Sequence, residues 1–361
     1  MNFDRVIAQE RPKRILSSAI TNERIPHAYL FNGPEGVGKE AMALEFAKAL
    51  FCSVKENAPC QNCSSCRRID GLKHPDVMFL FPMPKNTSTE EQREILDSLS
   101  RDRYFRTKPW ANAQIGIDRI REIRHISTLK PMEGRRVFIL ADAEAMTAEA
   151  ANALLKILEE PPTAMHLLLL TSRASLLLPT ILSRCQEVRF ALLPEDEIAA
   201  SLEKRRISSA EAESLAVISG GSLQRALRWH EGSIERGREK VVELLRCTLR
   251  DDLAQFEFIE EMLKKGDRRQ LRDVLDLLLI WFRDALIYSR TGGTANSLAN
   301  EDRRETLEKF ISAFESINYN RAMTALERAI EMMERNIQLN LILAVLLHQL
   351  GEILKLKGRA A

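Results

Sequence analysis

The 361-residue sequence lacks the features that mark several large classes of protein. Its net charge is only +2, so no overall electrostatic field indicates nucleic-acid binding, and any such contact must come from a local patch. The longest apolar runs, near Leu167–Leu170 and Leu339–Leu347, are far too short to cross a bilayer. The polar segment Met1–Arg14 contains no apolar stretch typical of a secretory signal. We therefore expect a cytoplasmic protein without membrane partners.

Cysteine is also scarce, and its placement is uneven. Of six cysteines, four are clustered: Cys52, Cys60, Cys63 and Cys66. Without a secretory signal, such a cluster predicts metal binding rather than disulfides. Four thiolates suit tetrahedral Zn²⁺, and a closed set of this kind is structural rather than catalytic. The C-x₂-C-x₂-C spacing also occurs in iron–sulfur proteins, so an iron–sulfur cluster and unligated cysteines remain the alternatives.

One glycine-rich segment resembles a phosphate-binding loop with an altered last position. The segment Gly33–Glu40 follows the pattern G-x-x-x-x-G-K-[S/T] up to its lysine, and its glycines are Gly33, Gly36 and Gly38. Main-chain N–H groups of such a loop wrap phosphates, and Lys39 would reach the outer ones. Glu40 stands where a hydroxyl should hold Mg²⁺, and one such repulsion at contact distance is roughly 4 kcal/mol at an effective dielectric near 20. The sequence therefore predicts a degenerate nucleotide site and leaves binding of ATP and Mg²⁺ open.

Apolar segments and helical stripes alternate as far as residue 190. We expect strands at 27–32, 137–141, 166–170 and 187–190, and helices at 40–51, 117–129 and 148–159. Alternation of this kind predicts a parallel sheet covered by helices on both faces. Beyond a small helical region that begins at Leu193, the chain has an almost entirely helical pattern.

Polar residues end two of these strands. Asp142 occupies the place of the Mg²⁺-binding carboxylate of a P-loop ATPase. In AAA+ ATPases a glutamate that orients water follows, but here Ala143 follows, and Glu144 is one residue late and expected on the other side. Thr171 ends the next strand and is a candidate γ-phosphate sensor. The alternative for both Asp142 and Thr171 is an ordinary role in a turn.

Ser183-Arg184-Cys185 lies between a short helical stretch and the last strand. A guanidinium is always charged and forks onto phosphate oxygens, so Arg184 suits an arginine finger supplied to another subunit. The alternative is a solvated surface charge.

The polar segment Pro84–Ala113 has the pattern of an insertion. Ser88 and Glu91 form a capping-box pattern that predicts an exposed helix followed by a loop. A local basic run follows, which we interpret as a solvated face: Arg101, Arg103, Arg106 and Lys108.

Together these motifs resemble bacterial clamp-loader subunits, the AAA+ gamma/tau and delta-prime subunits of DNA polymerase III. The resemblance is dense from Phe3 to Phe190, and the motifs that carry it are His27–Phe31, Gly33–Lys39, the four cysteines, Asn152–Lys156, Leu158–Pro162 and Ser183–Cys185. An ATP-hydrolysing gamma/tau chain would have Thr or Ser at position 40, Glu at 143 and an arginine in the Gly-Ser segment near 224. This chain has Glu40, Ala143 and Gln224, with Arg225 adjacent, and so is more similar to delta-prime.

The resemblance implies an organisation and a role. It implies an α/β P-loop AAA+ domain at 1–167 with an inserted Cys₄ zinc module at 52–66. A strand and a small helical lid domain follow at 168–207, the sheet continuing to about residue 190, and an all-α collar domain at 208–361. The implied role is a non-catalytic or weakly catalytic subunit that gives Arg184 to a neighbouring ATPase. The implied partners are the gamma/tau and delta subunits in a hetero-pentamer, the sliding clamp and, through the complex, primer-template DNA.

Two other functions are compatible with the same residues. One is a catalytically active gamma-type clamp-loader ATPase that tolerates Glu40 and Ala143. The other is a stand-alone P-loop nucleotide switch unrelated to replication.

Overall fold

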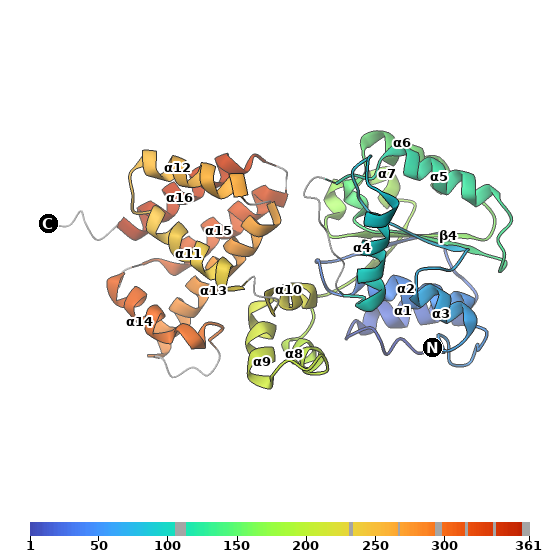
Figure 1. The fold of residues 1–361 in the computed structure, drawn as a ribbon, viewed down its shortest axis with the longest axis horizontal. Coiled ribbons are helices and arrows are strands. Elements are labelled where there is room, and N and C mark those ends of the chain that lie inside the picture. Colours follow the sequence, from blue (N-terminus) through green and yellow to red (C-terminus); the bar gives the residue numbers. More distant parts are fainter. Residues whose placement is uncertain are drawn as a thin grey trace. The chain divides into compact units, whose positions relative to one another are not determined.

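The computed structural model describes residues 1–104, 113–230, 234–265, 268–292, 298–314, 317–334 and 337–355. The chain divides into two compact units (Figure 1). The first comprises Met1–Ser208 with Ser219–Leu227, and the second comprises Ser209–Ile218 with Arg228–Ala361. The predicted division into three domains at 167/168 and 207/208 stays a prediction.

A five-stranded parallel sheet forms the centre of the first unit. Its strands lie in the order β2-β3-β4-β1-β5. They are β1 (Ala28–Asn32), β2 (Val77–Leu80), β3 (Arg136–Leu140), β4 (Met165–Thr171) and β5 (Gln186–Arg189). Leu167–Leu170 in β4 is an unbroken buried apolar run, as expected of a strand covered on both faces. The predicted α/β fold with a parallel sheet is confirmed, and β2 is a strand that the sequence interpretation missed.

Helices cover both faces of this sheet. The helices of this part of the chain are α1 (Glu10–Thr21), α2 (Lys39–Phe51), α3 (Ser64–Asp70), α4 (Thr89–Arg101), α5 (Ile117–Thr128), α6 (Ala148–Glu159), α7 (Pro179–Leu182), α8 (Glu195–Glu203) and α10 (Leu223–Arg228), with the 3₁₀ turns η1 (Ala143–Ala145) and η2 (Ala174–Leu176). In Figure 1, α5 and α6 lie on one face of the sheet, and α1, α2 and α3 lie on the other. Ile123 of α5 and Leu154 of α6 join Phe138 and Leu169 of the sheet in one buried core.

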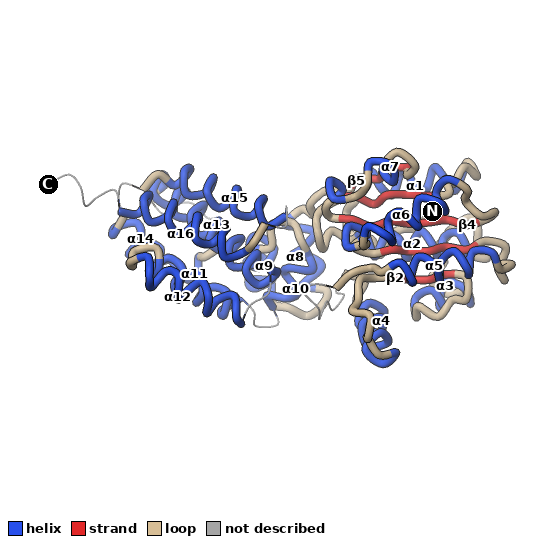
Figure 2. Tube along the Cα trace, turned by 90° about the horizontal axis from the view of Figure 1, so that it is seen from above, coloured by secondary structure: helices blue, strands red, loops and turns tan. Residues whose placement is uncertain are grey.

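The inserted segment forms α4, which Figure 2 shows set apart from the sheet. The predicted capping box is confirmed, because Ser88 and Glu91 exchange hydrogen bonds at the start of α4. Ile95 and Leu99 bury its narrow apolar stripe. Of the predicted basic run, Arg106 and Lys108 lie outside the described residues.

The second unit is helical throughout the part that the structure describes. Its elements are α9 (Ser209–Ile218), α11 (Ile234–Cys247), α12 (Asp252–Lys265), α13 (Arg268–Thr291), η4 (Glu301–Arg303), α14 (Arg304–Ala313), α15 (Tyr319–Glu334) and α16 (Leu339–Lys355). Helix α13 packs on α11 and α15, and α16 packs on α12 and α15. Leu278, Phe282, Leu326 and Leu347 are completely buried in this core. The prediction of a C-terminal helical region is confirmed, and none of the described helices is long and apolar enough to cross a membrane.

Candidate functional site

The glycine-rich loop joins β1 to α2, as a phosphate-binding loop requires. Gly38 has φ 97°, a left-handed conformation that favours glycine, and α2 begins at the next residue. Nearly all of α2 is buried beneath the sheet, so the position of the loop is fixed by a rigid helix. The first turn of such a helix, with its unpaired N–H groups, is a favourable place for an anion.

Lys39 is folded back onto its own loop. Its Nζ donates to the carbonyl oxygens of Gly33, at 2.6 Å, and Pro34, at 2.5 Å. The cation that should reach outer phosphates is therefore held within the loop. An incoming phosphate would have to compete with these two contacts.

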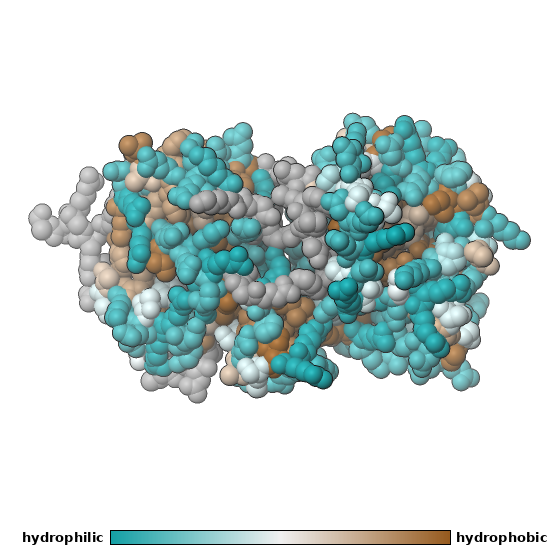
Figure 3. All heavy atoms as spheres, viewed as in Figure 1, coloured by the Kyte–Doolittle hydropathy of each residue, from teal (hydrophilic) through white to brown (hydrophobic). Residues whose placement is uncertain are grey.

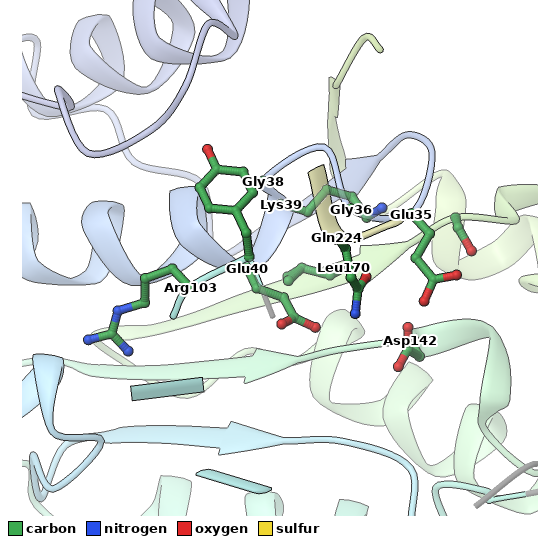
Figure 4. Close-up of a pocket in the computed structure, with 11 residues that line it drawn as sticks. Glu35, Gly36, Gly38, Lys39, Glu40, Arg103, Asp142, Leu170 and Gln224 are labelled. Carbon is green, nitrogen blue, oxygen red and sulfur yellow. The ribbon is translucent and has the colours of Figure 1, made fainter. Parts of the chain in front are cut away.

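A small cavity of about 40 Å³ lies beside the loop (Figure 4). The carboxylates of Glu35, Glu40 and Asp142 face the same region in Figure 4. Because carboxylates at short range raise each other's electrostatic energy and repel phosphates, this lining is unfavourable for a triphosphate. The structure therefore places the two predicted carboxylates, Glu40 and Asp142, in one cavity lining, and Glu35 adds a third.

Two predicted nucleotide residues lie outside this lining. Gly33 contributes its carbonyl oxygen to Lys39 rather than a group to the cavity. Thr171 is buried, and its hydroxyl accepts a hydrogen bond from the N–H of Arg173 at 3.0 Å, as in a turn. Ser172, the next residue, lines the cavity instead.

Glu144 does not line the cavity but is bound to Ser172, which does. Its Oε1 accepts hydrogen bonds from the hydroxyl of Ser172 at 2.7 Å and from the N–H of Ser172 at 3.2 Å. Asp142 has φ 50°, and this left-handed turn leads into η1, in which Ala143 is completely buried. Glu144 is thus hydrogen-bonded to the residue that follows β4, and Ala143 has no side-chain group that could orient water.

The sequence interpretation did not assign five residues that line the cavity to the nucleotide site: Glu35, Arg103, Tyr104, Leu170 and Ser172. Arg103 and Tyr104 follow α4 in the inserted segment, whose basic residues it interpreted as a solvated face. The hydroxyl of Tyr104 accepts a hydrogen bond from the N–H of Ile7 at 2.7 Å. The available signal was a tyrosine next to Arg103 in a largely polar stretch, which is too weak to indicate a site.

The four clustered cysteines are brought together as the spacing predicts. The sulfur atoms of Cys52, Cys60, Cys63 and Cys66 all lie within 4.8 Å of one another. Tetrahedral zinc with Zn–S distances of roughly 2.3 Å needs sulfur separations of roughly 3.8 Å, so the set fits the ion with a small contraction. Each of three sulfurs also accepts a main-chain N–H: Cys60 N–H to Cys52 at 3.3 Å, Cys63 N–H to Cys60 at 3.4 Å, and Cys66 N–H to Cys63 at 3.4 Å.

These N–H contacts are the kind that orient and stabilise thiolate ligands. The main-chain N–H groups of Asn62 and Cys63 lower the pKa of the Cys60 thiol. Burial raises the pKa of the Cys66 thiol, which a bound cation would offset. The donor set therefore fits zinc, held by four sulfurs with no open position for a reaction.

A buried ionic network attaches the cysteine segment to α2. Lys48 is completely buried, and its Nζ lies 2.5 Å from both Glu45 and Asp70 and 2.8 Å from the amide oxygen of Gln61. Gln61 in turn donates to Glu45 at 2.6 Å. Gln61 lies between Cys60 and Cys63, and Asp70 ends α3, so the cysteine segment and the helix after it both contact the helix of the phosphate loop.

Arg184 lies apart from the cavity, on a partly exposed surface after α7. Its Nη1 donates to the carbonyl of Thr180 at 3.0 Å, and its Nη2 pairs with Glu159 at 3.0 Å. The side chain of Arg184 is 35% exposed and that of Glu159 is 50% exposed. Because Arg184 is not among the residues that line the cavity, it does not serve that cavity within this chain.

Comparison with known proteins assigns the chain to a family. The model of the family described as "DNA polymerase III, delta subunit" matches residues 8–194. The delta-prime subunit of DNA polymerase III from Pseudomonas aeruginosa is 34% identical over 265 residues, which cover 72% of this chain and 70% of that protein. The chain belongs to the delta-prime clamp-loader family.

Other relatives of the chain are also named as subunits of DNA polymerase III. The delta-prime subunit of Bacillus subtilis is 28% identical over 282 residues and 77% of each chain, and the Escherichia coli tau subunit is 30% identical over 279 residues, covering 74% of this chain and 39% of tau. A solved gamma subunit-related protein of Thermotoga maritima is 21% identical, with a TM-score of 0.41, and the match covers 94% of this chain and 99% of that one. The delta-prime chain is thus a DNA polymerase III clamp-loader subunit of the gamma/tau/delta-prime family.

The departures from a gamma/tau pattern have definite positions in this delta-prime chain. Glu40 lines the cavity, whereas Ala143 is buried. Gln224 lines the cavity too, while the adjacent Arg225 donates from Nη1 to the carbonyl of Ser219 at 3.3 Å. The residue of the Gly-Ser segment that lies next to the phosphate loop is therefore Gln224, whose side-chain amide carries no charge.

Proposed function

We propose that this delta-prime chain is a non-catalytic clamp-loader subunit that supplies Arg184 to the ATP site of a neighbouring subunit. The observation that carries the proposal is a contrast between two parts of the same domain. Glu40 and Asp142 face the chain's own cavity, whereas Arg184 lies outside it with a partly exposed guanidinium. The chain is thus poorly equipped to hydrolyse ATP and well equipped to act on a triphosphate held elsewhere.

The electrostatics of the cavity support the first half of this proposal. Catalysis of phosphoryl transfer depends on positive charge and Mg²⁺ around the phosphates, and on a residue that positions the attacking water. Here Lys39 is bound to two loop carbonyls, Glu40 replaces the Mg²⁺-binding hydroxyl, and Ala143 replaces the water-positioning glutamate. Each of these changes weakens a different part of the machinery.

The contacts of Arg184 support the second half. An exposed ion pair such as Arg184–Glu159 contributes only about 0–1 kcal/mol, so a triphosphate can displace Glu159 from the guanidinium. A guanidinium forks onto phosphate oxygens, and a finger supplied in trans can accelerate phosphoryl transfer roughly 10³- to 10⁵-fold. The short helix α7 and the strand β5 hold the arginine between two fixed elements.

The second unit supports assembly with other subunits. Exposed apolar side chains gather on α12 and α16: Leu253 at 70%, Phe256 at 59% and Leu341 at 56% exposure. Figure 3 shows hydrophobic residues over this part of the helical unit. Exposed apolar groups of this kind are typical of interaction surfaces. We propose that this unit forms a collar with the gamma/tau and delta subunits in a hetero-pentamer.

The remaining parts of the proposal concern the metal and the task of the assembly. The cysteine module would hold structural Zn²⁺, which supports the fold and takes no part in ATP chemistry. The assembly would act in the cytoplasm, opening the sliding clamp and loading it on primer-template DNA.

ATPase assays of the reconstituted clamp loader test the proposal. Replacing Arg184 with alanine should lower the ATPase rate of the complex while leaving assembly on a sizing column intact. Arg189→Ala is the matched control, because Arg189 is an exposed arginine on the adjacent strand that, among the described residues, pairs with Glu187 on its own strand. An unchanged rate in Arg184→Ala would remove this residue from the mechanism.

Assays of the purified chain test the two alternative functions, an active gamma-type ATPase and a stand-alone nucleotide switch. Turnover of ATP by the chain alone, abolished in Lys39→Ala, would identify an active gamma-type ATPase. Failure to join gamma/tau and delta subunits on the same column would favour a stand-alone nucleotide switch.

A further inference from the structure

Tyr104 lies against the phosphate loop, although it comes from the inserted segment. Its side chain is almost completely buried, at 6% exposure. A Cβ built on Gly38 would lie 2.7 Å from the hydroxyl oxygen of Tyr104 and 2.8 Å from Cε1 of its ring. The ring therefore covers the last glycine of the loop, at the residue before α2 begins.

The hydroxyl of Tyr104 also fills a position that a ligand could use. It accepts the N–H of Ile7 at 2.7 Å, and this N–H belongs to the segment that leads into α1. A main-chain N–H beside a phosphate loop is a suitable partner for an acceptor atom of a nucleotide base or sugar. Burial raises the pKa of the Tyr104 phenol, so the side chain remains neutral in this place.

Two ionic contacts hold the two residues that directly precede Tyr104. Arg103 donates to Asp70 Oδ1 at 2.9 Å, at the end of α3. Asp102 accepts from Arg205 at 2.9 to 3.1 Å, just beyond α8, and also from the N–H of Tyr104 at 2.9 Å. The chain leading into Tyr104 is therefore fixed to the end of α3 through Arg103 and to the segment after α8 through Asp102.

The space that remains is too small for a nucleotide. The cavity has a volume of about 40 Å³, whereas pockets for small-molecule ligands occupy roughly 300–1,000 Å³. If phosphates bound to the loop, the sugar and base of the nucleotide would have to extend past the first turn of α2. The ring of Tyr104 lies against that turn.

We propose that Tyr104 is a built-in occupant of the nucleotide site, placed there by the inserted segment and fixed through Asp70 and Arg205. The site is closed by the chain itself, in addition to being altered at Glu40. This inference deepens the proposed function, since it explains how the chain's own site is kept empty, and it rests on that function for its biological meaning.

Titration of the isolated full chain with ATP and Mg²⁺ tests the closure. In the Glu40→Thr variant, which restores the hydroxyl, Tyr104 still closes the site, and we expect ATP to bind only weakly. In Glu40→Thr/Tyr104→Ala the site opens, and we expect ATP to bind at least about tenfold more tightly, because affinity scales with the fraction of open chains. Glu40→Thr/Tyr104→Phe is the matched control, which keeps the ring and should behave like Glu40→Thr.

Equal affinity of folded Glu40→Thr and Glu40→Thr/Tyr104→Ala would overturn the proposal. If the alanine variant does not fold, Glu40→Thr/Asp102→Ala tests the same point by releasing the contacts of Asp102 with Arg205 and with the N–H of Tyr104. That variant should bind ATP more tightly than Glu40→Thr, and no change would again overturn the closure. The ATPase effect of Arg184→Ala in the complex does not depend on Tyr104, so failure of either proposal leaves the other testable.

Discussion

The guanidinium of Arg184 lies 3.0 Å from the carboxylate of Glu159, the last residue of α6. The pair joins the two motifs that distinguish this region of the sequence, Leu158–Pro162 and Ser183–Cys185. Glu159 holds the arginine while no phosphate is present, and the pair is exposed enough to exchange partners. The glutamate and a neighbour's triphosphate would therefore compete for one cation.

Glu159→Gln should consequently raise the ATPase rate of the reconstituted complex, by up to about fivefold, because an exposed pair contributes at most about 1 kcal/mol. The assay is steady-state phosphate release with clamp and primed DNA. Glu160→Gln, one residue further on, is the control and should leave the rate unchanged. A lower rate in Glu159→Gln would mean that the glutamate orients Arg184 for its task.

Metal analysis of the purified chain should find one zinc per molecule in a colourless protein, and a brown protein containing iron would contradict this. Cys63→Ser should abolish metal binding and lower the melting temperature of the first unit, since structural zinc can contribute roughly 10 kcal/mol or more in small metal-dependent folds. Cys185→Ser lies outside the cluster and should retain the metal. An unchanged melting temperature would indicate a module that the domain does not need.

Lys48→Met should destabilise the first unit by about 3–5 kcal/mol, because it leaves the buried carboxylate of Glu45 without its cation, whereas Asp70 keeps Arg103. The shift of the urea midpoint measures this loss. Arg121→Ala breaks an exposed pair with Asp118 and should change the stability by no more than about 0.5 kcal/mol. Equal effects of the two substitutions would contradict the assigned role of the network.

Phe256→Glu should prevent the chain from joining gamma/tau and delta subunits while leaving its helical content unchanged, since Phe256 is 59% exposed on α12. Co-elution on a sizing column and circular dichroism measure the two properties. Lys264→Glu, on the same helix, also introduces a negative charge and should assemble normally. Normal assembly of Phe256→Glu would show that the exposed face of α12 is not the surface that contacts the other subunits.

The parts of the fold predicted from the sequence are those specified by local pattern. The strand, glycine loop and helix at 28–51, the cysteine cluster and the capping box of α4 each depend on residues close together in the chain. Strand β2 was missed because four apolar residues carry too little periodicity to distinguish a strand. The position of Tyr104 was beyond prediction, because its partner Ile7 is 97 residues away in the sequence.

The buried ammonium of Lys48 has a consequence for protein engineering. Because this side chain on α2 is satisfied partly by Gln61 and Asp70, the segment from Cys52 to Asp70 is an integral part of the nucleotide-binding domain. Excision of this segment would leave Lys48 without two of its partners. A minimal domain without the cysteines would therefore need apolar residues in place of both Lys48 and Glu45. Without those two replacements, the helix α2 and the cysteine segment have to be transplanted together.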